Sequence, residues 1–129
     1  MASNAAPLSA ENFQNLLNVS RENMERLSIY AEHLKRWNTR INLVSAASMT
    51  DLWRRHILDS AQLIDHLPPE AGEIIDLGTG AGFPGLVLAI LSDHRAHLIE
   101  ADTRKAAFLV EVVRLTEASA CLLYTSPSP

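Results

Sequence analysis

Four glycines and one carboxylate follow an apolar run in "IIDLGTGAGFPG", residues 74–85. A short apolar run that ends in glycines is typical of a buried strand. Pro84 stands where a helix can begin, because the N–H that proline lacks would be unpaired there in any case. The next residues, "GLVLAILS", predict a buried helix. This order of strand, glycine loop and helix constrains the fold more than any other feature of the chain.

A second predicted strand and helix follow the first pair. "AHLIEAD" predicts the strand, and "TRKAAFLVEVVRLTEA" predicts an amphipathic helix with Thr103 as its N-cap. This order is the start of a doubly wound, Rossmann-like parallel sheet of the α/β class. "CLLY" could begin a third strand, but the chain then passes into "TSPSP", and no predicted strand reverses the strand order.

The residues before the sheet are predicted to be helical. Ser9 and Ser20 are suitable N-caps, "NTRINLVS" predicts a loop, and a third helical stretch runs from about Thr50 to just before Pro68. Apolar residues recur at helical spacing, which predicts that they belong to the core: Phe13, Leu16 and Leu17 after the first cap, and Met24, Leu27, Tyr30, Ala31, Leu34 and Trp37 after the second.

Composition narrows the class of protein. A chain of 129 residues with 47% hydrophobic and 20% charged residues is ordinary for one globular domain. No stretch approaches the roughly 18 apolar residues that span a membrane, and the N-terminus lacks the pattern of a signal peptide. The single Cys121 excludes an internal disulfide and cannot build a structural zinc site. We therefore expect a cytoplasmic monomer without a metal or a membrane partner.

Basic residues are concentrated in the N-terminal half. Seven of the eleven lysines and arginines lie between Arg21 and Arg55, against four acidic residues, although the formal charge of the whole chain is −4. Solvated helix faces and an anionic partner both remain open explanations.

Three kinds of ligand compete for the glycine loop. A phosphate-binding P-loop is excluded, because no lysine follows Gly85. The dinucleotide fingerprint G-x-G-x-x-G is present literally at residues 80–85. Two residues oppose it: Asp76 would meet the pyrophosphate with a negative charge, and Pro84 removes one N–H from the turn.

The third ligand is S-adenosylmethionine, a cofactor without phosphate and with a cationic ammonium. Asp76 at the strand end suits that ammonium, and Gly78, Gly80 and Gly82 let the backbone approach the ligand closely. Glu100, at the end of the second strand, is placed to accept hydrogen bonds from ribose hydroxyls. The structural alternative is that Asp76 caps the following turn and Glu100 is a solvated strand end.

Four segments together point to one family. "RWNTRINLVS", "RRHILDS", "IIDLGTGAGFPGLVLAI" and "LIEADTRKAAFL" occur in an order and spacing that resemble the bacterial small-subunit rRNA guanine-N7 methyltransferases, also called glucose-inhibited division protein B. The resemblance covers about residues 10–118. It implies methyl transfer from S-adenosylmethionine to N7 of a guanine in 16S rRNA. It also implies a cofactor pocket formed by Asp76, Gly78, Gly80, Gly82, Phe83 and Glu100.

The resemblance leaves the RNA side of the site less defined. It places "RHILDS" beside the cofactor loop, so that His56 and Asp59 line the site or the RNA entry; alternatively, Asp59 pairs with Arg55 on a helix. Arg36, Arg40 and Arg54 are candidates for contacts with RNA phosphates or for a solvated face. No acid–base residue is expected to be catalytic, because guanine N7 carries a free lone pair.

The end of the chain departs from the family pattern. We expect an N-terminal helical region at 1–69, a partial Rossmann-like methyltransferase core at 70–120, and a non-native or disordered tail at 121–129. The family continues with further strands and basic residues, so we expect this chain by itself to be inactive. The rival hypotheses are an inert remnant or cofactor-binding module without catalysis, and a fragment of an NAD-dependent oxidoreductase.

Overall fold

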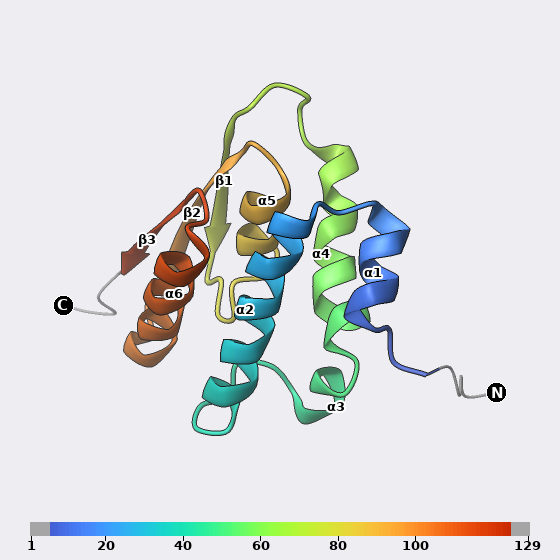
Figure 1. Cartoon of the computed structure of the whole chain (residues 1–129). Helices are drawn as coiled ribbons and strands as arrows, with labels where there is room; N and C mark the ends of the chain where they lie inside the picture. Colours follow the sequence, from blue (N-terminus) through green and yellow to red (C-terminus); the bar gives the residue numbers. More distant parts are fainter. Residues whose placement is uncertain (1–5, 125–129) are drawn as a thin grey trace.

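Three parallel strands form the sheet in the structure, a computed structural model that describes residues 6–124 (Figure 1). The strands are β1 (Glu73–Leu77), β2 (Arg95–Glu100) and β3 (Ala120–Tyr124), and their spatial order is β1-β2-β3. Leu77 pairs with Ile99, and Ile99 pairs with Leu123, so the strands end at one common edge. The predicted Rossmann-like parallel sheet is confirmed, and no described strand reverses its order.

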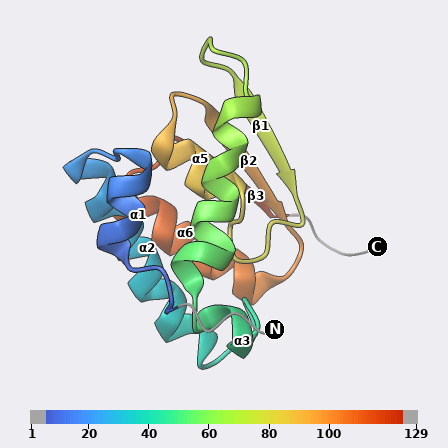
Figure 2. The same cartoon turned by 90° about the vertical axis from the view of Figure 1, so that its right-hand side faces the viewer.

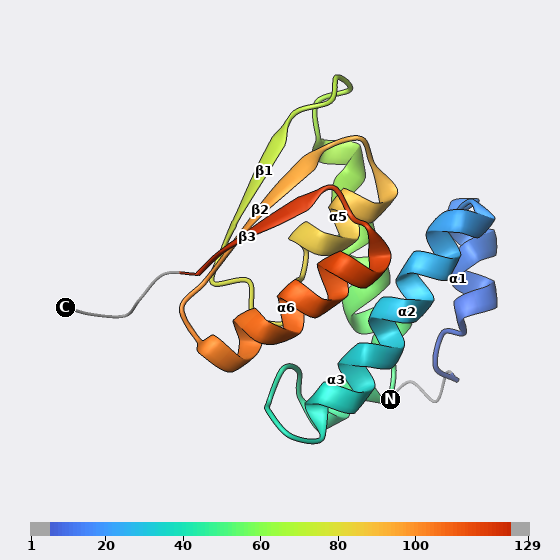
Figure 3. The same cartoon turned by 60° about the vertical axis from the view of Figure 1, so that its left-hand side comes forward.

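The helices of the described residues lie on one face of this sheet (Figures 2 and 3). Helix α5 (Gly85–Leu91) links β1 to β2, and α6 (Thr103–Thr116) links β2 to β3. Helix α2 (Arg21–Asn38) packs across both, and α1 (Ala10–Leu17) lies outside it. The core fills the space between sheet and helices with side chains that are almost completely buried: Leu27, Tyr30, Leu34, Ile57, Leu86, Val87, Leu98, Phe108, Leu109 and Val112.

Side-chain caps fix where the helices begin. Ser9 Oγ accepts a hydrogen bond from Asn12 N at 3.0 Å, and Ser20 Oγ accepts one from Asn23 N at 3.1 Å, which confirms both predicted N-caps. The prediction of Thr103 as a cap is wrong by one residue. Asp102 Oδ1 accepts from the next two free N–H groups of α6, and Thr103 is the first helical residue.

The third helical stretch is less regular than its apolar spacing predicts. It consists of α3 (Ala46–Met49), a π-helical segment η1 (Trp53–Leu58), α4 (Asp59–Ala61) and a 3₁₀ segment η2 (Gln62–His66). A π turn adds one residue to the helical repeat, so residues four apart no longer lie above one another. Arg55 and Asp59 accordingly form no ion pair among the described residues.

The face of the sheet opposite the helices is open in the described chain, and it is apolar near the carboxyl ends of the strands. Ile75 is 67% exposed and Leu77 is 74% exposed, so the prediction of a buried first strand is wrong for these residues. Leu77, Ile99 and Leu123 form a row across the strands, because the register places them opposite one another. Leu16 and Leu17 of α1 are also exposed, contrary to their predicted place in the core.

The end of the chain partly joins the sheet. Residues 121–124, which the sequence assigns to the tail, lie in β3 and pair with β2. Residues 125–129 lie outside the described part of the chain.

Substitution of two leucines should distinguish the open face of the sheet from the core. Leu98→Ala removes a fully buried side chain of β2 and should lower the free energy of unfolding by about 2–5 kcal/mol. Leu77→Thr alters an exposed position and should change it by no more than about 0.5 kcal/mol. Urea unfolding followed by circular dichroism measures both, and equal losses would show that β1 is covered in solution.

Candidate functional site

Asp76 joins the end of β1 to the start of α5. Its Oδ2 accepts hydrogen bonds from Thr79 Oγ1 at 2.8 Å and from Gly85 N at 3.0 Å. Gly85 N is one of the N–H groups that the first turn of a helix leaves unpaired, so Asp76 caps the turn as the structural alternative anticipates. Asp76 Oδ1 has no hydrogen-bond donor among the described residues. The same carboxylate therefore retains a free acceptor for a cationic ligand.

The glycines of the loop fall into two pairs. Gly78, Gly80 and Gly82 all have positive φ, of 61°, 58° and 95°. A Cβ on Gly78 or Gly80 would meet no atom within 4 Å, so these two glycines border open space. A Cβ on Gly82 would lie 2.7 Å from Tyr30 Oη, and one on Gly85 would lie 2.8 Å from Leu98 Cδ2. The second pair is therefore required by packing, and the first pair leaves room for a ligand.

Glu100 is a buried carboxylate at the end of β2, with only 7% of its surface exposed. Its Oε1 accepts from Gly80 N at 2.7 Å, and its Oε2 accepts from Ala101 N and Asp102 N at 3.1 and 2.9 Å. The alternative of a solvated strand end is wrong. A carboxylate has about four acceptor positions, so one remains for a ligand hydroxyl beside Gly80.

Aromatic rings support the loop from the helical side. Tyr30 of α2 is buried and donates its hydroxyl to Ala81 O at 2.6 Å. Burial, and secondly the negative charge of Asp76, raise the pKa of Tyr30 well above its ordinary value. Phe83 stacks against Tyr30 at 5.3 Å and against His56 at 4.9 Å between ring centroids. The loop is thus held by helices far from it in sequence.

His56 contacts the loop through Phe83, on which its ring is stacked. Its Nε2 is buried without a hydrogen-bond partner among the described residues. Burial, followed by the positive charge of Arg55, lowers the pKa of His56, and Asp59 opposes this only in part. This shift of the pKa favours the neutral imidazole. Asp59 is exposed, and no hydrogen bond or ion pair joins it to the loop within residues 6–124.

The three candidate RNA-binding arginines do not lie together. Arg54 pairs with Asp51 at 2.5 Å and donates to Ala6 O, on the side of α1. Arg36 and Arg40 instead line a pocket of about 630 Å³ with Arg104 of α6. Sequence patterns gave no indication of Arg104 or of the contact between Tyr30 and the loop, because both depend on helices packed across the chain.

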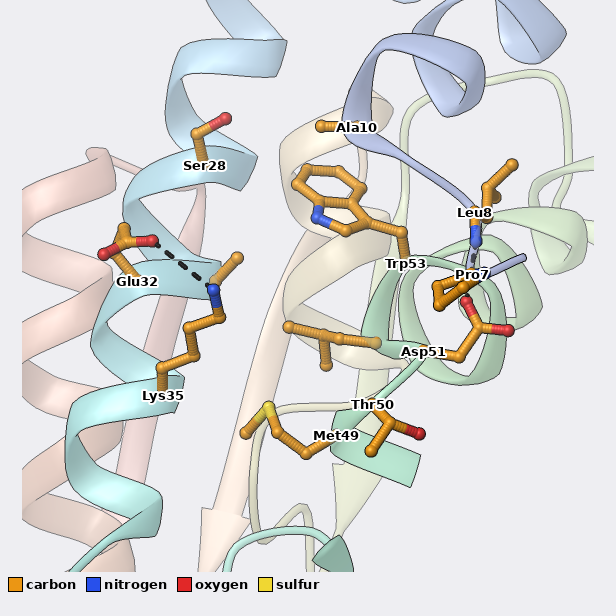
Figure 4. Close-up of a pocket in the computed structure, with 12 residues that line it drawn as sticks. Pro7, Leu8, Ala10, Ser28, Glu32, Lys35, Met49, Thr50, Asp51 and Trp53 are labelled. Carbon is orange, nitrogen blue, oxygen red and sulfur yellow. Dashed lines mark hydrogen bonds and ion pairs between the residues drawn. The ribbon is translucent and has the colours of Figure 1, made fainter. Parts of the chain in front are cut away.

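A separate pocket of about 300 Å³ lies between α1, α2 and α3 (Figure 4). Asp51 lines it and accepts from Leu8 N at 2.9 Å. Burial alone would raise the pKa of Asp51, but the hydrogen bond from Leu8 and the charge of Arg54 lower it. None of the predicted cofactor residues lines this pocket, so it is distinct from the glycine loop.

The described part of the chain offers neither a metal centre nor a membrane span. Within residues 6–124, no group of three or more histidine, cysteine, aspartate or glutamate side chains is arranged to hold a metal ion. In the same residues, no helix is both long and apolar enough to cross a membrane.

A parallel sheet with a glycine loop after β1 and an acidic residue at the end of β2 is the arrangement of a Rossmann-like fold, and the family match makes it a Rossmann-like methyltransferase fold. The chain belongs to the GidB family, described as rRNA small subunit methyltransferase G, whose family model matches residues 23–121.

Individual relatives agree with this family. The chain is 54% identical over 111 residues to the ribosomal RNA small subunit methyltransferase G of Rhodospirillum centenum, a match that covers 86% of this chain and 51% of that protein. The protein of the same name from Rhodospirillum rubrum is 57% identical over 98 residues, covering 76% and 49%. The one from Parvibaculum lavamentivorans is 52% identical over 115 residues, covering 86% and 51%. The chain spans about half the length of these curated relatives.

Alanine substitutions should distinguish the two pairs of glycines. Gly80→Ala meets no neighbouring atom and should cost only the strain of positive φ, about 1–2 kcal/mol. Gly82→Ala adds a clash with Tyr30 Oη and should cost at least about 3 kcal/mol. Thermal unfolding measures both. A Gly80 variant less stable than the Gly82 variant would contradict this division.

The lowered pKa of His56 should make the free energy of unfolding depend on pH. In the folded chain this pKa lies below the ordinary histidine value of about 6.5, so protons bind His56 preferentially in the unfolded chain. The free energy of unfolding should therefore fall as the pH drops below that value. His56→Phe keeps an aromatic ring against Phe83 but cannot titrate. We expect its stability to fall less than that of the wild type between about pH 7 and pH 5. Equal pH dependence would show that His56 titrates alike in both states.

Proposed function

We propose that this chain supplies the cofactor-binding part of an S-adenosylmethionine-dependent methyltransferase that modifies N7 of a guanine in 16S rRNA of the small ribosomal subunit. The observation that carries the proposal is the open space beside Gly78 and Gly80 between two carboxylates, in a chain of the rRNA small subunit methyltransferase G family. The names of the relatives support an rRNA substrate.

The residues of the loop fit the cofactor in size and charge. The free Oδ1 of Asp76 offers an acceptor to the ammonium of S-adenosylmethionine, and the remaining acceptor of Glu100 offers one to a ribose hydroxyl. Gly78 and Gly80 leave the backbone open to the ligand. Gly82 and Phe83 contribute indirectly, because they pack the loop against Tyr30. When bound, the cofactor would supply an electrophilic methyl group.

Methylation of guanine N7 does not require general acid–base catalysis by the protein. Its lone pair is free, so no residue of the site would have to remove a proton from it before methyl transfer. The protein contributes by aligning the two reactants and excluding water. This agrees with a loop whose stacked histidine, His56, has a lowered pKa that favours the neutral ring. We propose that His56 and Asp59 shape the RNA entry and take no part in proton transfer.

A titration separates this proposal from its rivals. Isothermal calorimetry with S-adenosylhomocysteine and with NAD should show binding of the first compound only. Binding of NAD alone would favour the oxidoreductase hypothesis. Binding of neither would favour an inert remnant. Transfer of a radiolabelled methyl group to 16S rRNA, measured on the chain extended to the length of its relatives, tests the reaction itself.

Gly78→Asp should weaken the binding of S-adenosylhomocysteine by at least about tenfold, or about 1.4 kcal/mol. The added carboxylate would occupy the open space and repel the carboxylate of the ligand. Aspartate tolerates positive φ better than most residues, so the fold should survive the change. Gly72→Asp is the matched control, because Gly72 lies before β1 and outside the loop. Unchanged affinity in Gly78→Asp, or an equal loss in Gly72→Asp, would remove Gly78 from the site.

A further inference from the structure

A pocket between α2 and α6 combines positive charge with an apolar floor. It has a volume of about 630 Å³, within the range of small-molecule sites. Its lining comes from the end of α2, the turn that follows it, and one side of α6: Arg36, Trp37, Thr39, Arg40, Ile41, Arg104 and Glu111. Segments more than 60 residues apart in sequence therefore build it, and α2 and α6 pack side by side along it (Figure 3).

The three arginines that line the pocket form no ion pairs within the described residues, although Asp102, the cap of α6, places a carboxylate near Arg104. Arg36, Arg40 and Arg104 are exposed, and none forms an ion pair with a carboxylate among residues 6–124. Arg54 differs in this respect, because it pairs with Asp51. Three guanidinium groups against one glutamate leave the pocket positively charged, and guanidinium groups are well suited to binding phosphate oxygens.

The floor of the pocket is held rigidly. Trp37 Nε1 donates to Glu111 Oε2 at 3.0 Å, and the indole packs edge-on against Phe108 at 5.7 Å between ring centroids. Ile41 beside it is only 8% exposed. An aromatic surface fixed in this way can receive a flat ring without losing side-chain freedom on binding.

Arg104 connects the pocket to the end of the sheet that carries the glycine loop. Arg104 follows Glu100 by four residues, in the first turn of α6, and Glu100 bonds to Gly80 of the loop. The first turn of α6 and the glycine loop therefore lie at the same end of the sheet, where β1 and β2 end (Figure 1). An RNA strand that reached the loop could extend to the pocket by way of Arg104.

We propose that this pocket binds one unstacked nucleotide of single-stranded RNA, with its phosphates on the arginines and its base against Trp37 and Ile41. The proposal rests on the proposed function and adds to it the place where RNA beside the target guanine is held. RNA is recognised mainly through unpaired bases that stack on aromatic or guanidinium planes. The carboxylates of an acidic peptide would pair with the arginines of the pocket, but such a peptide has no flat ring to stack on Trp37.

The experiment measures fluorescence anisotropy of a labelled single-stranded RNA dodecamer with this chain over a range of salt concentrations. Arg40→Gln and Arg104→Gln should each weaken binding about three- to tenfold at low salt. Each should also reduce the slope of log affinity against log salt by about 0.7, the loss of one phosphate contact. Arg114→Gln, at the other end of α6, removes the same charge outside the pocket and should change affinity less than about twofold.

The contribution of the base to binding is tested by changing the RNA and not the protein, so that the fold is not disturbed. An abasic dodecamer should bind about tenfold more weakly than the intact RNA, because it cannot stack. Equal affinity for the intact RNA, the abasic RNA and poly-glutamate would overturn the proposal and leave a general anion site. Equal effects of Arg104→Gln and Arg114→Gln would overturn it as well.

The two proposals fail separately. The wild-type titration with S-adenosylhomocysteine reports on the glycine loop, and the RNA measurements report on the pocket. If the chain binds S-adenosylhomocysteine and its affinity for RNA is unchanged in the pocket variants, only the proposal for the pocket is overturned. RNA binding that depends on Arg40 and Arg104, without cofactor binding, would support the pocket and overturn the cofactor site.

Discussion

The candidate site depends on one buried carboxylate. Glu100 lies out of water at the end of β2, where an ionised group is costly unless hydrogen bonds compensate for its lost hydration. Three backbone N–H groups do so, two from the turn into α6 and one from Gly80. The same bonds fix the glycine loop relative to the second strand. Removing the carboxylate would therefore disturb the loop and the start of α6 together, before any effect on a ligand.

Much of the fold follows from local patterns in the sequence. The apolar runs before Gly78 and before Asp102 predict β1 and β2, and serine caps predict the start of α1 and α2. The exposure of β1 could not be predicted from the sequence. An apolar run has the same pattern whether one face or both faces of the strand are covered. The π-helical segment η1 was not predicted either, since one extra residue in a turn leaves the apolar spacing almost unchanged.

The site was predictable where it is continuous in sequence. Asp76 and the glycines follow one another in the chain, and their motif indicates both a turn and a ligand. The motif allows Asp76 either to cap the following turn or to bind a ligand. In the structure one carboxylate oxygen caps the turn, which leaves the other for a ligand. Contacts between distant segments gave no local signal. Tyr30 lies 51 residues from Ala81, and Trp37 lies 74 residues from Glu111, so only the packed helices bring them together.

The bond between Tyr30 and Ala81 gives the loop a sensitivity to alkali. It consists of one phenolic proton shared with a backbone carbonyl inside the core, and a phenolate has no proton to donate. Because the folded chain holds that proton more tightly than the unfolded chain, stability is lost as the pH rises above the ordinary tyrosine pKa of about 10. Ionisation of Tyr30 would thus remove the hydrogen bond that ties α2 to the glycine loop. The stability of the fold at high pH and the anchoring of its candidate binding loop thus share one dependence, the phenolic proton of Tyr30.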